Sequence, residues 1–445
     1  MVYWLMPGTK LKNLILLMLG LIFYSFGSIS ALGVLLVFSL VNYLLGLALR
    51  RKPGKVLLTL GIVLDLGFLC AYKYLDFLLS QVLGLPQMQW SLAAPLGISF
   101  FTFKCISYLV DTYRKPEQGT GSFMKLLLYI SFFPQIVAGP IARFSQFAPQ
   151  LEKRNASLEQ IAGGVRRFVI GLAKKLILAG TFATVADGVF SLESGVLNAP
   201  LAWAGAIGYC LQIYFDFSGY SDMAIGLGAI FGFETPENFD YPYIAPTIGN
   251  FWRRWHMSLS GWFKDYLYIP LGGNRKGKAR AALNKFIVFA LCGFWHGASW
   301  NFLVWGAWHG VLSALESLNI IPAKKLEKTR VFGRIYTLLA VCLGFVFFRA
   351  ATLSQGAQML SAMFTGFFVN DVARVAWHSL INLEVLVMLV FGILFSMPVC
   401  RWLKGRQKLY AVLEPVSYIA VLALFVLCLA KMAAGGFSPF IYAQF

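Results

Sequence analysis

The sequence has few charged residues and very few histidines for its length of 445 residues. Charged side chains make up 13% of it, and histidine occurs four times, at positions 256, 296, 309 and 378. Soluble domains carry about 25% charged residues, so an array of water-soluble domains is excluded. The sequence also lacks the HExxH pattern of zinc peptidases and the GxxxxGK[ST] loop of nucleotide hydrolases. We therefore expect no metal site and no phosphate-binding loop.

Cysteine gives no sign of a covalent framework. The seven cysteines fall mostly inside apolar runs, in an odd number and without a Cys-x-x-Cys spacing. This distribution argues against disulfide-based folding and against a zinc ribbon. We interpret them as reduced, small hydrophobic residues.

Long apolar runs are what the sequence has in abundance. Hydrophobic residues make up 58% of the chain, and runs of more than about 18 apolar residues, enough to cross a bilayer, recur along it. We predict an all-α polytopic membrane protein with about ten or eleven membrane segments. Residues 1–445 are expected to form a single membrane-embedded domain without an internal repeat.

The excess of basic residues fits a membrane setting. Lys and Arg total 38 against 19 Asp and Glu, a formal net charge of +19. These residues lie between apolar runs, where they set the orientation of the helices and meet anionic lipid headgroups. We therefore predict membrane lipid as a partner and no nucleic acid. Arg50, Arg51 and Lys52 follow the second run and place that end of the first hairpin in the cytoplasm.

Three segments depart from a simple transmembrane pattern. Residues 123–144 contain Pro134, Gly139 and Pro140, so we expect this helix to break or re-enter, with a kinked helix as the alternative. Residues 286–315 are too short for two crossings and long for one, which favours two short helices meeting part way through the bilayer. Residues 250–270 alternate aromatic and basic side chains, which predicts an interfacial helix with its apolar face in the headgroup boundary.

The histidines are the best candidates for chemistry. His296 lies roughly ten residues into the segment of two short helices, or about 15 Å deep at 1.5 Å per residue, and an ionisable group at that depth indicates function. Neutral imidazole is a general base that is cheap to bury. His256 lies on the basic interfacial segment, and His309 could face the same cavity as His296. The alternative is a packing histidine at position 296 and an ordinary interface histidine at position 256. Cys292 shares a helix face with His296, but an apolar helix offers little to lower a thiol pKa.

Several long motifs resemble those of the membrane-bound O-acyltransferase family, in its alginate O-acetyltransferase-like branch, from about residue 90 to 316. The motifs are FFPQIVAGPIARF (132–144), QIYFDFSGYSDMAIG (212–226), PENFDYPY (236–243), FWRRWHMSLS (251–260) and WFKDYLYIPLGGNRKG (262–277). The resemblance implies a helical funnel with short and re-entrant helices at a thin centre. It also implies that His256 and His296 are the catalytic pair. Our hypothesis is that His296 acts as general base and that His256 orients or polarises the donor, helping to stabilise the oxyanion.

The resemblance further implies the substrates and location. A cytoplasmic acyl thioester such as acetyl-CoA would be the donor, with no bound cofactor. Its phosphates would meet a set of basic side chains that lipid headgroups could also occupy: Arg253, Arg254, Lys264, Arg275, Lys276 and Arg280. The acceptor would be an extracytoplasmic polysaccharide, reached directly or through a partner resembling SGNH-type acetyltransferases, at a bacterial inner membrane.

Two other functions stay open at this point. A D-alanyl transferase fed by a carrier protein, acting on teichoic acid, resembles the same motifs, although the GGNR stretch favours the alginate-type branch. A small-molecule transporter would also use broken helices and polar groups within the membrane. The absence of an internal repeat counts against the transporter.

Overall fold

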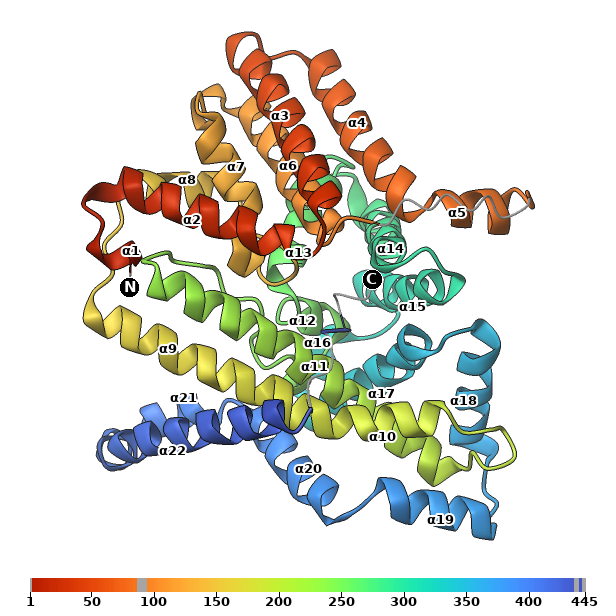
Figure 1. Ribbon diagram of the computed structural model, residues 1–445. Coiled ribbons are helices and arrows are strands. Elements are labelled where there is room, and N and C mark those ends of the chain that lie inside the picture. Colours follow the sequence, from red (N-terminus) through yellow and green to blue (C-terminus); the bar gives the residue numbers. More distant parts are fainter. Residues whose placement is uncertain (1, 86–93, 436–439, 442–445) are drawn as a thin grey trace. The chain divides into compact units, whose positions relative to one another are not determined.

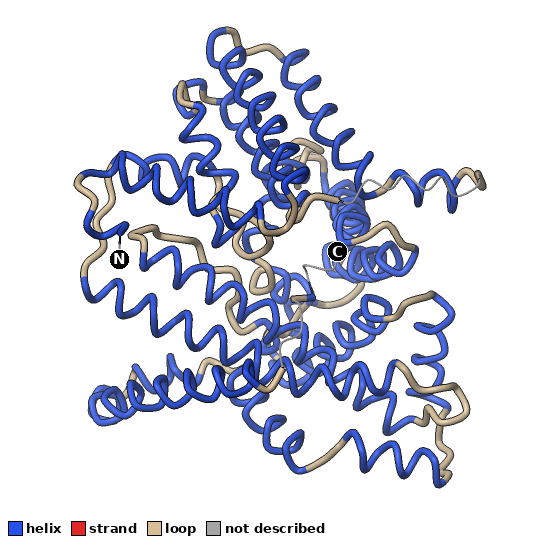
Figure 2. The backbone as a smooth tube through the Cα atoms, in the orientation of Figure 1, coloured by secondary structure: helices blue, strands red, loops and turns tan. Residues whose placement is uncertain are grey.

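The computed structural model describes residues 2–85, 94–435 and 440–441. These residues form helices joined by loops, with no strand among them (Figures 1 and 2). The predicted all-α fold is confirmed. Two compact units are distinguished, one of residues 1–165 and 224–236 and one of residues 166–223 and 237–445. That the whole chain acts as one domain stays a prediction.

The first unit is built from the N-terminal helices. Its main elements are α2 (Gly8–Ser25), α3 (Ile29–Arg51), α4 (Lys55–Lys73), α6 (Ile98–Arg114), α7 (Phe123–Ser131) and α8 (Phe144–Glu152). Helix α3 starts after Ser28, whose hydroxyl accepts a hydrogen bond from Ala31 N, and ends with Arg50 and Arg51, where positive charge favours a helix C-terminus.

The expected break after α7 is confirmed. Helix α7 ends at Ser131, and the chain continues through a 3-10 turn at Phe133–Gln135 to α8 at Phe144. Pro134, which lacks a backbone N–H, lies in that turn. Most of the intervening residues are buried, so this irregular backbone is enclosed by protein.

The second unit holds the rest of the chain. Helix α9 (Leu158–Ala173) continues through a π-helical turn into α10 (Gly180–Phe190), and α11 (Ala199–Ile230) follows. Residues 158–165 of α9 and 224–230 of α11 belong to the first unit. The later elements are α12 (Ile248–Trp252), α13 (Met257–Phe263), α14 (Gly277–His296), α15 (Trp300–Ser317), α16 (Ala323–Lys328), α17 (Arg330–Arg349), α18 (Leu353–Thr365), α19 (Asp371–Leu380), α20 (Leu383–Phe395), α21 (Val399–Lys404) and α22 (Gln407–Ala433).

Glycines bring α9 and α11 into close backbone contact. A Cβ atom on Gly171 would lie 2.5 Å from the carbonyl oxygen of Gly219. No larger residue fits this crossing without moving one of the helices. The contact brings the basic residues of α9 and the following turn beside the acidic residues of α11.

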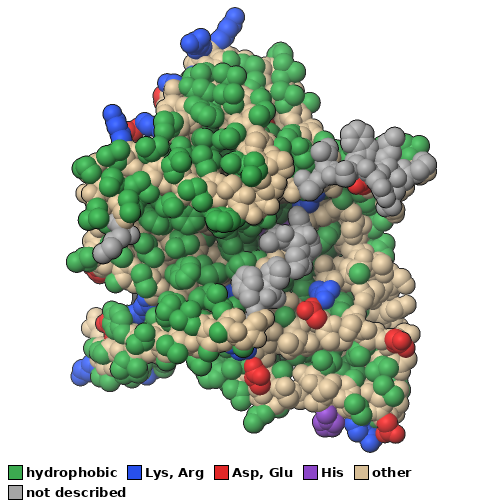
Figure 3. Space-filling model, in the orientation of Figure 1, with side chains coloured by type: hydrophobic (Ala, Val, Ile, Leu, Met, Phe, Trp, Pro, Cys, Tyr) green, Lys and Arg blue, Asp and Glu red, His purple; other side chains and the backbone are tan. Residues whose placement is uncertain are grey.

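Among the described residues, six helical segments are long and apolar enough to cross a membrane, or seven if the bent pair α19–α20 counts as one span. The six are Gly8–Ser25, Ile29–Arg51, Lys55–Lys73, Leu158–Phe190, Arg330–Arg349 and Gln407–Ala433. Hydrophobic side chains spread over much of the visible face of α2 and α3 (Figure 3). Such exposed apolar surface is expected against lipid. The prediction of ten or eleven segments stays a prediction.

The hairpin of two helices is confirmed, although its first helix starts earlier than expected. Helix α14 begins at Gly277 rather than Phe286 and ends at His296, and α15 begins at Trp300. Gly293 and Gly306 face each other, and a Cβ on Gly293 would lie 3.0 Å from the Cα of Gly306. The two helices therefore pack with their backbones close together.

The prediction of one interfacial helix over residues 250–270 is wrong. The segment is divided into α12 and α13, and His256 between them has a left-handed backbone conformation (φ 42°). Its apolar side chains are buried in protein rather than turned to lipid, namely Phe251, Trp252, Trp255, Trp262 and Phe263. Phe251 and Trp252 form part of a core because α12 packs against α15 and α17.

Candidate active site

His256 lies at a sharp turn between α12 and α13, and α12 is anchored at its N-terminus. Helix α12 is capped by the hydroxyl of Thr247 and by Glu316 of α15, whose carboxylate accepts hydrogen bonds from Ile248 N (2.7 Å) and Gly249 N (2.9 Å). A carboxylate at a helix N-terminus is favourable for both the orphan N–H groups and the helix dipole. His256 follows this anchored helix and adopts a left-handed backbone conformation at the start of α13.

The imidazole of His256 is buried and lies edge-to-face with the ring of Phe217, with 4.6 Å between the ring centroids. Its Nδ1 is 3.1 Å from the side-chain oxygen of Asn238. Burial lowers the pKa of His256 to about 3, since an apolar environment disfavours the charged ring. The imidazole is therefore neutral at physiological pH.

His296 is the last residue of α14 and is 3% exposed. Three aromatic rings surround it edge-to-face: Trp295 (4.8 Å between centroids), Trp305 (5.1 Å) and Phe348 (5.2 Å). Its position at the C-terminal end of α14, immediately before Gly297, places the residue at the tip of the hairpin.

Ring contacts connect the two histidine-bearing elements. Trp255, the residue before His256, packs against Phe345 at 5.4 Å between centroids, and Phe345 lies 6.1 Å from Phe348, which touches His296. The structure thus joins the two predicted catalytic elements in one aromatic cluster of the second unit.

His309 belongs to the same cluster. Its ring lies 5.3 Å from Trp305 and 5.2 Å from Trp252, and it is fully buried on α15. Within the described residues, neither ring nitrogen has a hydrogen-bond partner. His378 is exposed in the last turn of α19.

The basic residues predicted for the donor phosphates separate into two groups. Arg253, Lys264, Arg275, Lys276 and Arg280 are exposed. Arg254 is different, because it is half-buried and bound to Asn250 (2.9 Å) and to Asp240 (2.9 Å). Its charge is thus already balanced inside the protein.

The GGNR loop is held by a buried asparagine. Asn284 of α14 donates to the carbonyl of Gly273 at 3.0 Å, and Gly272 and Gly273 both have positive φ. Glycine is the residue suited to such a turn. The arrangement presents Arg275 and Lys276 on the surface ahead of α14.

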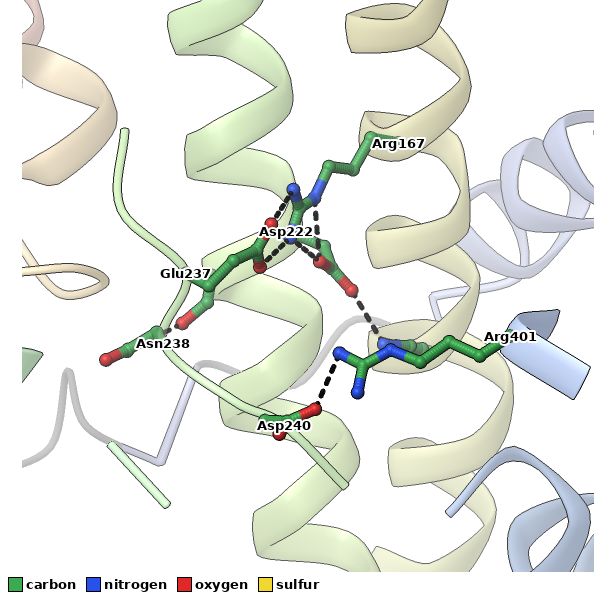
Figure 4. A network of polar contacts seen from close by, with 8 residues as sticks. Arg167, Asp222, Glu237, Asn238, Asp240 and Arg401 are labelled. Atoms are coloured by element: carbon green, nitrogen blue, oxygen red, sulfur yellow. Dashed lines mark hydrogen bonds and ion pairs between the residues drawn. The ribbon is translucent and has the colours of Figure 1, made fainter. Parts of the chain in front are cut away.

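A network of partly exposed charges escaped the sequence reasoning. Arg167 of α9 binds both Asp222 of α11 (2.8 Å) and Glu237, and Lys174 binds the other oxygen of Asp222 at 2.6 Å. Figure 4 shows Arg167 between the two carboxylates, and Arg401 directed at Asp240. Acidic residues inside two of the quoted motifs, 212–226 and 236–243, were the available signal.

Comparison with known proteins identifies the family of the chain. A sequence model of the membrane-bound O-acyltransferase family matches residues 88–350. The chain belongs to this family. The resemblance seen in the motifs is confirmed, and the protein is a multi-pass membrane O-acyltransferase. Within the described residues, no three His, Cys, Asp or Glu side chains group closely enough to hold a metal ion.

Relatives of this acyltransferase match over most of its length. A probable alginate O-acetylase of Azotobacter vinelandii is 36% identical over 485 residues, covering 100% of this chain and 96% of the relative. A peptidoglycan O-acetyltransferase of Helicobacter pylori is 36% identical over 78% of this chain and 73% of its own. A teichoic acid D-alanyltransferase of Bacillus subtilis is 30% identical over 57% of this chain and 68% of its own.

Proposed function

We propose that this acyltransferase moves an acetyl group from a cytoplasmic thioester, acetyl-CoA, toward an extracytoplasmic polysaccharide at a bacterial inner membrane. The observation that carries the proposal is the aromatic cluster that brings His296 together with the element of His256 in the part of the chain matched by the family. Relatives named for alginate and for peptidoglycan support a polysaccharide acceptor, and both are named for acetyl transfer.

In the proposed reaction, His296 is the general base. An incoming hydroxyl attacks the thioester carbonyl carbon and gives its proton to the imidazole. The tetrahedral intermediate then collapses, the carbon–sulfur bond breaks, and the proton passes to the departing thiolate. One ester and one molecule of free thiol result. The hydroxyl belongs to the polysaccharide or to an SGNH-type partner that completes the transfer.

The exposed basic residues around the GGNR loop would bind the donor. Arg275, Lys276 and Arg280 follow one another on an exposed stretch and suit the phosphates of CoA. Replacing all three with Gln is expected to raise KM for acetyl-CoA and leave kcat nearly unchanged, because the contacts are the same in ground and transition states. Arg254 is assigned a structural role through Asp240 rather than donor binding.

The test is release of free thiol from acetyl-CoA by the purified protein in detergent. We expect turnover in the wild type and a loss of at least about 100-fold in His296→Ala, the range for a general base. His378→Ala is the matched control, since it removes an exposed histidine of α19. Equal turnover in wild type and His296→Ala would refute the role of His296.

A D-alanyl transfer function is the second candidate, and the Bacillus subtilis relative favours it. It predicts turnover of a D-alanyl carrier-protein thioester and none of acetyl-CoA. Uptake of a small molecule into vesicles without any thioester turnover would instead indicate a transporter.

A further inference from the structure

Asn238 lies in the segment between α11 and α12, and this segment runs beside the turn that carries His256. Met257 N donates to the carbonyl oxygen of Asn238 at 2.9 Å, and Asp240 N donates to the carbonyl oxygen of Arg254 at 2.9 Å. These two backbone hydrogen bonds bracket His256. They bring the fully buried Asn238 side chain against the imidazole.

The orientation of the Asn238 amide follows from its neighbours. The backbone N–H of Ser258 lies 3.2 Å from Oδ1, and the hydroxyl of Ser258 lies 2.8 Å from the same atom. A backbone N–H can only donate, so the atom facing it must be the amide oxygen. The amide nitrogen faces the other way and donates to Ser221 Oγ at 3.0 Å.

The tautomer of His256 then follows. Nδ1 of His256 is 3.1 Å from the same oxygen of Asn238. Because that oxygen is an acceptor, Nδ1 must carry the hydrogen and donate it. A neutral imidazole has one N–H, so Nε2 carries the lone pair.

We propose that Asn238 is a positioning residue that fixes His256 as the tautomer with hydrogen on Nδ1, so that Nε2 acts in the reaction as an acceptor. This inference rests on the proposed function for its catalytic meaning. A neutral ring in this tautomer cannot donate a hydrogen bond from Nε2 to an oxyanion. In the reaction Nε2 of His256 therefore accepts a hydrogen bond, and the oxyanion needs a different donor.

The surroundings of Asn238 support a fixed geometry. Glu237, the preceding residue, is bound by Arg167, and Asp240, two residues later, is bound by Arg401 (Figure 4). Arg254 also binds Asp240. Ion pairs on both sides anchor the short segment, so the amide has little freedom to rotate away from the imidazole.

The experiment reads the tautomer directly. The chain has four histidines, so the full-length protein labelled with nitrogen-15 histidine gives few signals, and His256→Gln identifies those of His256. We expect the wild type to carry its hydrogen on Nδ1. Asn238→Leu should change that pattern, whereas Asn198→Leu should leave it intact. Asn198 is the matched control, a buried asparagine that accepts from Leu201 N at 3.2 Å and donates to Phe368 O at 3.2 Å.

Activity and pH give the second readout. Asn238→Asp keeps an acceptor at the same place and adds charge, which favours the imidazolium. We expect it to shift the acidic limb of the pH–rate profile upward, while Asn238→Leu lowers kcat by roughly 10- to 100-fold. A merely structural asparagine would leave the position of that limb unchanged.

Hydrogen on Nε2 in the wild type, or an unchanged His256 signal in both Asn238 variants, would overturn the inference. Failure of the proposed function looks different. In that case acetyl-CoA is not consumed, yet the nitrogen spectrum still shows hydrogen on Nδ1.

Discussion

Lys175 and Asp216 form an ion pair between the π-helical turn after α9 and the middle of α11, and both side chains are only 3% exposed. The second carboxylate oxygen of Asp216 accepts the backbone N–H of Ile441 at 2.9 Å. Removing one member of a buried pair costs about 3–5 kcal/mol, because the other charge is left without compensation. Replacing both members with apolar residues of similar size is often close to neutral.

The structure predicts which of the three variants loses the most stability. Asp216→Leu removes the carboxylate that balances the Lys175 ammonium. It also leaves the N–H of Ile441 without its acceptor, which adds about 1–3 kcal/mol to the loss of stability. Lys175→Met strands the carboxylate but keeps that N–H bond. The double variant removes both charges together and loses the bond to Ile441 and the contact of Lys175 with the Phe440 ring, so we expect it to be more stable than Asp216→Leu by roughly 3 kcal/mol.

The assay is thermal unfolding of all four proteins in one detergent at one scan rate, because large membrane proteins often unfold irreversibly. Arg374→Met is the control, since it breaks an exposed pair with Asp371 worth about 0–1 kcal/mol. A double variant less stable than Asp216→Leu would refute the reasoning. Additive effects of the two single changes would refute it as well.

Other changes test the packing, the cap and the buried imidazole. Gly171→Leu should destabilise by at least about 1–3 kcal/mol through overpacking against Gly219, measured as thermal midpoint, whereas Gly163→Leu on the same helix meets no atom within 4 Å and should be tolerated. Glu316→Gln should cost about 1–2 kcal/mol, because an amide has one acceptor for two N–H groups; equal midpoints would contradict the cap. The pKa of His256 is lowered to about 3, so an unfolded chain binds a proton that the folded one excludes. Stability should fall as pH drops from about 6.5 toward 3, and His256→Gln should reduce that slope when midpoints are followed between pH 7.5 and 5.

The helices and their breaks could be predicted from the sequence, because apolar runs and prolines determine local backbone structure. The break at Pro134 and the hairpin around His296 both follow from rules about single helices. The segment around Trp252 and Trp255 was misjudged for the opposite reason. Alternating aromatic and basic residues look the same whether the aromatic face meets lipid or another helix, and only the packing of α12 against α15 and α17 decides between them.

The site was predicted unevenly for a similar reason. The scarcity of histidine was enough to direct attention to His256 and His296. Asn238 and Asp240 could not be found this way, since their roles depend on contacts with residues 14 to 20 positions away in an irregular segment, such as Arg254 and Ser258. Arg254 was predicted to bind the donor from its charge alone, because its ion pair with Asp240 is evident only in the folded chain.

The hydrogen bond between Asp216 and Ile441 can form only late in synthesis of the chain. The two residues are 225 positions apart, and ribosomes add about 5–20 residues per second, so Asp216 is made roughly 10 to 45 s before that N–H exists. Lys175 precedes Asp216 by 41 positions and is already present. During synthesis the lysine is therefore the available partner for the new carboxylate, and a residue made 225 positions later completes its hydrogen bonding.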